Sequence, residues 1–213
     1  MGDQVRGLFI TLEGGDGVGK TTNADLLEEW LTTECGRSVV RTREPGGTEL
    51  GASIRQLLLH TPGHVDPKAE ALLYAADRAQ HVNTVIRPAL ERGDVVLQDR
   101  YIDSSVAYQG AGRVLGAEEI RSLSEWASDA LWPDLTILLD LDPAEAERRR
   151  QAVRTGYDRL EAEEADFHRR VRDGFLALAE AEPDRFLVVD AAQPLEAIAV
   201  LVRERVSQLL IAQ

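Results

Sequence analysis

The sequence contains one cysteine, few aromatic residues and no long apolar run. With Cys35 alone, neither an internal disulfide nor a cysteine-based zinc site is available, and a reducing cytoplasm fits this composition. The N-terminal residues pass directly into a strand-like segment without the apolar core of a signal peptide. No later apolar run has the length that spans a bilayer. We therefore expect a cytoplasmic protein with no membrane partner.

Positive charge is scarce compared with negative charge. Asp and Glu number 37 and Lys and Arg 24, which gives a formal net charge of −13. This excess repels a polyanion, so we expect no nucleic-acid partner. A phosphorylated small molecule remains compatible with the composition, because the groups and the metal ion at a site govern what binds there.

Short apolar runs alternate with longer segments of helical spacing along the 213 residues. This alternation predicts an α/β fold, with a doubly wound parallel sheet of five strands flanked by helices. Because neither a linker-like stretch nor an internal repeat interrupts the pattern, we expect a single domain over residues 1–213. The arginine-rich stretch 148–172 is predicted to be a solvated helical region. The predicted strands are Leu8–Leu12, Ser38–Thr42, Asp94–Gln98, Leu135–Leu141 and Arg185–Val189.

A glycine-rich motif follows the first predicted strand and precedes a predicted helix. Residues 14–21 read Gly-Gly-Asp-Gly-Val-Gly-Lys-Thr and satisfy the P-loop pattern G-x-x-x-x-G-K-[ST]. In such a loop the backbone N–H groups surround phosphate oxygens, Lys20 neutralises the β- and γ-phosphates, and Thr21 ligates Mg²⁺. GTPases, ATPases and small-molecule kinases all use this loop, so the motif leaves the reaction open. The residues expected to bind ATP are Gly14, Gly15, Asp16, Gly17, Val18, Gly19, Lys20, Thr21 and Thr22.

An acidic residue and a basic residue follow one another at the end of the third predicted strand. Asp99 lies on the sheet edge where doubly wound folds bind ligands, and it is expected to help Thr21 hold Mg²⁺. Arg100 places a cation beside that carboxylate, which suits an enzyme that brings two anionic phosphates together. The alternative is an Asp/Arg pair that only caps a strand end.

Four segments resemble the signatures of bacterial thymidylate kinases, a family of P-loop nucleoside monophosphate kinases. Residues 99–110, DRYIDSSVAYQG, are similar to the family's D-R-[YH]-x-x-S-x-x-A-[YF]-Q-G stretch. Residues 42–48 (TREPGGT), 72–78 (LLYAADR) and 158–161 (DRLE) resemble three further signatures in the same order. The resemblance runs from about residue 8 to the final helix. It implies transfer of the γ-phosphoryl group of Mg·ATP to the 5′-phosphate of dTMP by a homodimeric enzyme.

The resemblance implies that Arg78 hydrogen-bonds the thymine ring and that Tyr74 stacks on its face. These residues are four apart on a predicted helix and so share one side of it. An aromatic plane beside a forked donor suits a flat base with carbonyl acceptors. From periodicity alone, a core tyrosine and a solvated arginine remain the alternative. The other acceptor-site residues that the resemblance implies are Glu44, Arg55, Arg100, Ser105, Tyr108 and Gln109.

The resemblance places Arg55 and Arg100 on the dTMP phosphate, where a guanidinium can bind two phosphate oxygens at once. Ser105 and Gln109 are expected near the polar edge of the base. Glu44 resembles a family residue that faces the sugar and the metal, although its Glu-Pro-Gly-Gly segment is also typical of a simple turn.

The P-loop contains no arginine between positions 15 and 18, so positive charge over the transferring phosphate has to come from elsewhere. The segment around 148–160 resembles the basic lid of the bacterial enzymes, with Arg148, Arg149, Arg150 and Arg154 as candidates. Arg154 is favoured because Thr155 and Gly156 allow it to swing; the alternative is a charged helix in solvent. The resemblance also implies a role for Asp16, which matches an acidic position of the family near the sugar and the metal, with a turn residue as the alternative. The catalytic residues are predicted to be Asp16, Lys20, Arg100 and Arg154.

Two other classes of P-loop protein are alternatives to a dTMP kinase. Another nucleoside monophosphate kinase or a deoxynucleoside kinase of the same fold would differ in its acceptor pocket, and the latter needs a base for a neutral hydroxyl. A regulatory GTPase should carry an N-K-x-D segment, which this sequence lacks. The four histidines show no metal-ligand spacing and are predicted to be ordinary surface or helix residues. Adenine contacts are expected from residues 191–194, after the last strand.

Overall fold

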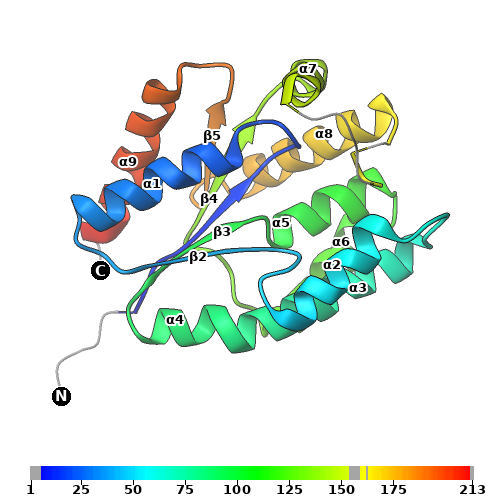
Figure 1. Cartoon of the computed structure of the whole chain (residues 1–213), viewed down its shortest axis with the longest axis horizontal. Coiled ribbons are helices and arrows are strands. Elements are labelled where there is room, and N and C mark those ends of the chain that lie inside the picture. The colour runs from blue at the N-terminus through cyan, green and yellow to red at the C-terminus, as the bar shows by residue number, and fades with distance from the viewer. Residues whose placement is uncertain (1–5, 154–158, 162, 212–213) are drawn as a thin grey trace.

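The computed structural model describes residues 6–153, 159–161 and 163–211, with five parallel strands in the order β2-β3-β1-β4-β5 (Figure 1). The predicted α/β class and parallel sheet are confirmed. Each predicted strand is present, and four of the five are displaced by one residue toward the C-terminus. The strands are β1 (Phe9–Glu13), β2 (Val39–Arg43), β3 (Val95–Asp99), β4 (Leu135–Asp140) and β5 (Phe186–Asp190).

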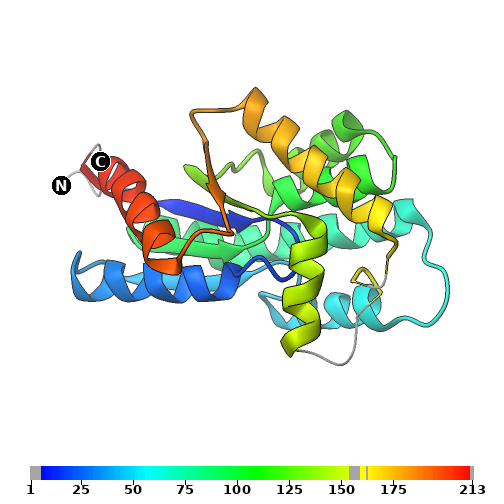
Figure 2. The same cartoon turned by 90° about the horizontal axis from the view of Figure 1, so that it is seen from above.

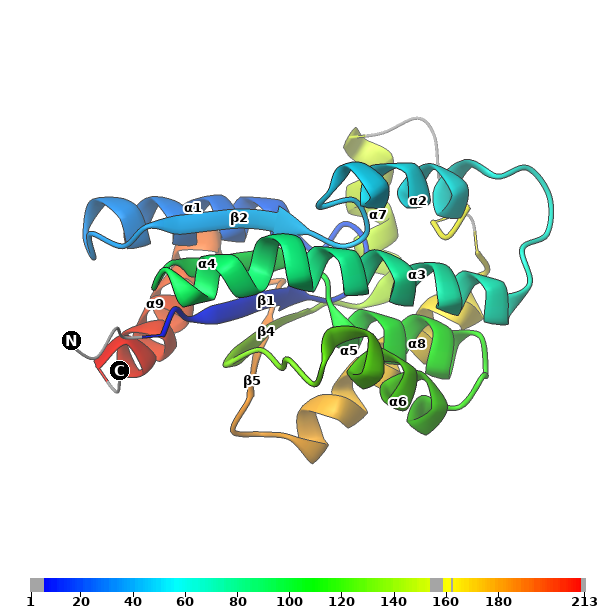
Figure 3. The ribbon, with the colours of Figure 1, turned by 90° about the horizontal axis from the view of Figure 1, so that it is seen from below.

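Helices cover both faces of the sheet, as Figure 1 shows. The helices are α1 (Lys20–Thr33), α2 (Glu49–His60), α3 (Pro67–His81), α4 (Arg87–Glu91), α5 (Ile102–Ser105), α6 (Ala117–Ser128), α7 (Pro143–Val153), α8 (Ala165–Ala181) and α9 (Leu195–Ile211). Two π-helical segments, η1 (Val82–Ile86) and η2 (Val106–Gly112), continue α3 and α5. Figure 3 shows α2 and α3 side by side. None of the described helices is both long and apolar enough to cross a membrane.

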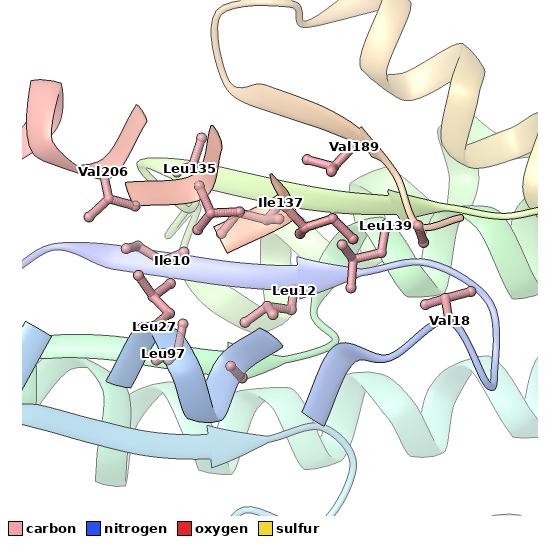
Figure 4. Packing of buried hydrophobic residues seen from close by; sticks show 14 of the residues in the cluster. Ile10, Leu12, Val18, Leu27, Leu97, Leu135, Ile137, Leu139, Val189 and Val206 are labelled. Atoms are coloured by element: carbon pink, nitrogen blue, oxygen red, sulfur yellow. The ribbon is translucent and has the colours of Figure 1, made fainter. Parts of the chain in front are cut away.

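Alternate side chains of the strands enter different hydrophobic cores. Ile10 of β1 packs with Leu27 of α1 and Val206 of α9 in the core between the sheet and those two helices (Figure 4). Phe9, one position earlier, packs on the opposite face with Ile102 of α5. The period of two in a strand therefore sorts neighbouring residues to two cores. Glu13 lies on the same side of β1 as Phe9.

Strand order places the phosphate loop at the centre of the carboxyl edge of the sheet. β1 lies between β3 and β4. The chain runs from β1 to β2 at one edge of the sheet, returns to β3, and then crosses over β1 to form β4 on the other side. Such a switch point opens a crevice beyond the strand ends, where doubly wound folds bind ligands. In the register, Leu12 pairs with Asp99 and Glu13 pairs with Leu138, so the loop, the end of β3 and the end of β4 meet there.

The arginine-rich stretch is more strongly packed than its composition suggested. Its second helix, α8, buries Phe167, Val171 and Phe175 against the core formed with α2 and η2. Arg148 is largely exposed, whereas only 9% of the surface of Arg150 is exposed to solvent. The prediction of a solvated region is therefore wrong for α8, because apolar residues spaced every four positions form a buried stripe among the charges. Figure 2 shows α7 crossing beside the loop that follows β1.

Candidate active site

The phosphate loop is shaped by glycines in conformations that other residues avoid. Gly14, Gly17 and Gly19 have φ angles of 127°, 84° and 95°. A side chain at Gly14 would place its Cβ 2.4 Å from the carbonyl oxygen of Leu139 in β4. Helix α1 begins at Lys20, immediately after Gly19, so its first N–H groups and its positive dipole end face the loop.

The amine of Lys20 lies over this loop. It donates to the carbonyl oxygens of Gly14 at 3.2 Å and of Gly15 at 2.7 Å, and the residue keeps 8% of its surface. Burial lowers the Lys20 pKa, as does the positive charge of Arg100, while Asp99 and Asp16 oppose this change. The ammonium is therefore held by backbone oxygens of the phosphate loop, and the charges of Asp99 and Asp16 favour its protonated form.

Oxygen atoms that suit a hard cation line a cavity beside the phosphate loop. Thr21 is exposed at the start of α1, and Asp99 lines the cavity with it. The Oδ1 atom of Asp99 is buried and accepts no hydrogen bond from the described residues. One hydroxyl, one carboxylate and room for phosphate oxygens and water match the way proteins bind Mg²⁺. Arg149 and Arg150 of α7 also line this cavity, which we call the donor cavity.

Arg100 connects the phosphate loop to the neighbouring pocket. Its guanidinium donates to Asp16 Oδ1 at 2.6 Å, to the Gly14 carbonyl and to the Ser104 hydroxyl at 3.0 Å each, and to the Tyr108 hydroxyl at 3.1 Å. Burial would raise the Asp16 pKa, but the nearby charges of Arg100 and Lys20 hold it well below its usual range. Asp16 is therefore a carboxylate throughout the physiological pH range.

All eight residues expected at the acceptor site line one pocket beside the donor cavity. The chain supplies them from the loop after β2, from α2 and α3, from the turn after β3, and from α5 and η2. Leu59, Leu160 and Ser104 also line the pocket and were not expected. The expected residues are Glu44, Arg55, Tyr74, Arg78, Arg100, Ser105, Tyr108 and Gln109.

Arg78 is one of the largest fully buried side chains in the described structure, with 1% of its surface exposed. It donates to Glu44 Oε2 at 3.0 Å, to Ser124 Oγ at 3.0 Å and to Ser105 Oγ at 2.9 Å. Its guanidinium also lies over the ring of Tyr101. The alternative of a solvated arginine is therefore wrong, and Arg78 has a structural role in addition to lining the pocket.

Sequence reasoning gave no role to His81, which the structure places in contact with the acceptor site. Its ring is fully buried, 3.2 Å from Glu44 Oε1 on one side and 2.6 Å from the Thr42 hydroxyl on the other. Asp77, in the same turn of α3, accepts from the N–H of Gly46, and burial together with the charge of Glu44 raises its pKa to about 6. The expectation of an ordinary histidine is therefore corrected: His81 helps to hold the Glu44 loop.

Glu70 is another buried residue that has a role in the structure but none in the sequence-based prediction. It accepts from Gln109 Nε2 at 2.9 Å and is paired with Arg113 and Arg159. Burial would raise the Glu70 pKa, but the hydrogen bonds from Gln109 and Arg159 and the charge of Arg113 lower it. Glu70 thereby joins α3, η2 and residues 159–161, which bring Leu160 to the pocket.

The lid residues are only partly covered by the structure. Arg149 donates to the Ala191 carbonyl at 3.1 Å, and Arg150 is paired with Glu147, also on α7. Arg154 and Asp158 lie outside the described residues, so Arg154 remains a prediction.

Comparisons with known proteins show which family this chain is similar to. The sequence model of the family described as Thymidylate kinase matches residues 12–201. The thymidylate kinase of Leifsonia xyli subsp. xyli is 69% identical over 199 residues, covering 93% of this chain and 94% of the relative. That of Clavibacter michiganensis subsp. michiganensis is 67% identical over 206 residues, covering 97% of each chain.

A solved structure extends the likeness to three dimensions. The crystal structure of thymidylate kinase from Ehrlichia chaffeensis has a TM-score of 0.77 and 34% identity, covering 95% of this chain and 99% of that one. The sequence model spans most of the chain, and the relatives and the solved structure match it over nearly its full length, so this chain belongs to the thymidylate kinase family.

Proposed function

We propose that this protein transfers the γ-phosphoryl group of Mg·ATP to dTMP and forms dTDP and ADP. One observation carries the proposal: the donor cavity and the acceptor pocket share Asp16, Glu44, Arg55 and Arg100 in their walls. Two phosphorylated ligands entering from the two sides would meet at these residues. Two arginines at the junction suit a site where two anionic phosphates approach each other.

The donor side supplies binding groups for the polyphosphate. The glycine-rich turn presents N–H groups at the start of α1, and the Lys20 ammonium exchanges its carbonyl partners for the β- and γ-phosphate oxygens. Thr21 and Asp99 would hold Mg²⁺, which neutralises charge on the phosphates when it is bound. The adenine base would lie near residues 191–194, where Arg149 contacts the Ala191 carbonyl.

The acceptor side supplies groups for a pyrimidine monophosphate. Arg55 and Arg100 bind the phosphate, while Tyr74 stacks on the base and Arg78, Ser105 and Gln109 lie at its polar edge. Arg55 donates to the Pro45 carbonyl at 3.0 Å, which places its guanidinium beside the Glu44 loop. The dTMP phosphate is ionised at neutral pH and attacks in line, so the protein's contribution is position and charge.

The basic lid completes the site. Closure over the phosphates would bring Arg154 toward the transferring group and exclude water, which otherwise accepts the phosphoryl group. Glu70 anchors the described end of this segment through Arg159. The sequence-based expectations of a homodimer and of a cytoplasmic location stay predictions.

Product analysis tests the proposed reaction. The protein is incubated with ATP, Mg²⁺ and dTMP, and the nucleotides are separated by ion-exchange chromatography. We expect dTDP and ADP in equal amounts, and no product when thymidine replaces dTMP, because thymidine lacks the phosphate that Arg55 and Arg100 would bind. ADP without dTDP would show that the site hydrolyses ATP without transferring its phosphoryl group to dTMP, and would contradict the proposal.

A further inference from the structure

Glu13 is a fully buried carboxylate that the proposed reaction does not use. It is the last residue of β1 and directly precedes Gly14 and the phosphate loop. Its Oε1 accepts from the backbone N–H of Tyr101 at 2.7 Å, and its Oε2 accepts from the hydroxyl of Ser104 at 2.6 Å. Tyr101 lies in the turn after β3, and Ser104 lies in α5, the helix that follows this turn. Glu13 therefore joins the strand before the phosphate loop to the segment that carries Arg100.

The two hydrogen bonds of Glu13 involve the residue that follows Arg100 and a hydrogen-bond partner of the Arg100 side chain. The hydroxyl of Ser104 donates its hydrogen to Glu13, so its lone pairs are available to the Arg100 guanidinium, which donates to Ser104 Oγ at 3.0 Å. A carboxylate accepts and does not donate, so it fixes the direction of the Ser104 hydrogen. The order of donors runs from Arg100 through Ser104 to Glu13.

The backbone of Arg100 needs such support. Its φ angle is 65°, in the left-handed region that residues other than glycine seldom adopt. Its N–H donates to the Leu12 carbonyl at 3.1 Å, and its own carbonyl accepts from Gln98 Nε2 at 2.9 Å. Together with the bond from Tyr101 to Glu13, these contacts hold an uncommon conformation that directs the Arg100 side chain toward Asp16.

Keeping a charged Glu13 in this place opposes folding. Burial and the charge of Asp103 together raise its pKa to about 7, although the hydrogen bond from Ser104 and the charge of Arg100 act in the other direction. The Glu13 charge also acts favourably on the Lys20 and Arg100 cations, which repel each other. Unfavourable buried groups of this kind are typical of functional sites.

We propose that Glu13 is a positioning residue for the acceptor phosphate: it holds Arg100, through Ser104 and the Tyr101 N–H, in the orientation that dTMP requires. This inference rests on the proposed function. It assigns Glu13 no contact with either nucleotide.

The test compares Glu13→Gln with Asp103→Asn. Asp103 is a neighbouring buried carboxylate whose hydrogen bonds go to Arg185 and Thr136, and among the described residues it is not a hydrogen-bond partner of Arg100. For Glu13→Gln we expect kcat/KM for dTMP to fall about 10- to 100-fold. The KM for ATP should stay within about threefold, and the melting temperature at pH 8 should equal or exceed that of wild type. For Asp103→Asn we expect the reverse, a lower melting temperature with kcat/KM for dTMP within about threefold of wild type.

A double-mutant cycle with Ser104→Ala separates positioning from general loss of structure. Because Glu13 acts on the Arg100 side chain through Ser104, adding Glu13→Gln to Ser104→Ala should cost less than Glu13→Gln costs alone. If Glu13→Gln does not fold, Ser104→Ala alone should still lower kcat/KM for dTMP with an unchanged KM for ATP.

Three results would overturn the inference. They are wild-type kcat/KM for dTMP in Glu13→Gln, a loss explained entirely by its unfolded fraction, and fully additive effects in the cycle. Wild-type protein that forms no dTDP would instead contradict the proposed function, and the two failures are thereby distinguished.

Discussion

The donor and acceptor sides of the site are built from different parts of the chain. The donor side is a contiguous segment, residues 14–22, whose backbone N–H groups and one lysine would meet the phosphates. The acceptor side is assembled from side chains spread over residues 44–109, and most of its polar groups bond to each other, as Arg78 does with Glu44. A change to a donor-side residue that bonds only within its own loop should therefore affect catalysis with little effect on stability, whereas a change on the acceptor side should affect both.

The largest effect should come from the donor side. Lys20→Ala should lower turnover roughly 10²- to 10³-fold, since it removes the charge that would follow the transferring phosphate. The melting temperature should hardly change, because within the described part of the chain the amine bonds only to two carbonyls of its own loop and burial already disfavours its charge. Steady-state kinetics and a thermal melt measure the two quantities. A large drop in melting temperature would show that Lys20 also supports the fold.

The second largest loss of turnover should come from a change in the lid. Arg154→Ala should lower kcat about 10²-fold and leave the dTMP KM nearly unchanged, the pattern of an interaction made chiefly in the transition state. Arg149→Ala and Arg150→Ala serve as comparisons, because both residues line the donor cavity from α7. Normal kcat in Arg154→Ala, with a loss in one of the other two, would assign the charge to α7.

On the acceptor side, Arg78→Ala should weaken dTMP binding by roughly 2–3 kcal/mol, in the range for charged hydrogen bonds. It should also lower the melting temperature, because it leaves Glu44 buried without its arginine. ATP affinity should hardly change. Calorimetric titration with each nucleotide and a thermal melt test these outcomes.

Ser124→Ala is the matched control for Arg78→Ala. Ser124 is a fully buried partner of the same guanidinium but does not line the pocket. This variant should lower the melting temperature and leave dTMP affinity unchanged. Wild-type dTMP affinity in folded Arg78→Ala would show that the base is bound elsewhere.

The smallest effect concerns the pH dependence of stability. The Asp16 pKa is held below its unfolded value of 3.8, so its contribution to stability is present above that pH and is lost in more acidic solution. The melting temperature of Asp16→Asn should therefore lie a few degrees below that of wild type at pH 7, and this difference should become smaller as the pH falls below 4. A difference in melting temperature that is the same at every pH would show that the charge of Asp16 does not cause it.

The donor side could be predicted from the sequence, because a strand, eight motif residues and a helix specify it locally. Parts of the acceptor side also followed from the sequence, although Tyr74 and Arg78 depended on a resemblance rather than on their periodicity. The bonds of Glu13, His81 and Glu70 could not be predicted. Each joins residues that lie far apart along the chain, up to 91 positions for Glu13 and Ser104, and no local pattern marks such pairs.

The most direct test of the account measures kcat/KM in a coupled ADP-release assay with ATP, Mg²⁺ and a panel of acceptors. The panel contains dTMP, CMP, AMP and thymidine at matched concentrations. If the pocket formed around Tyr74, Arg78 and Gln109 binds thymine and the two arginines at the junction bind the acceptor phosphate, dTMP should have the highest kcat/KM. A clear preference for CMP, AMP or thymidine would contradict the account.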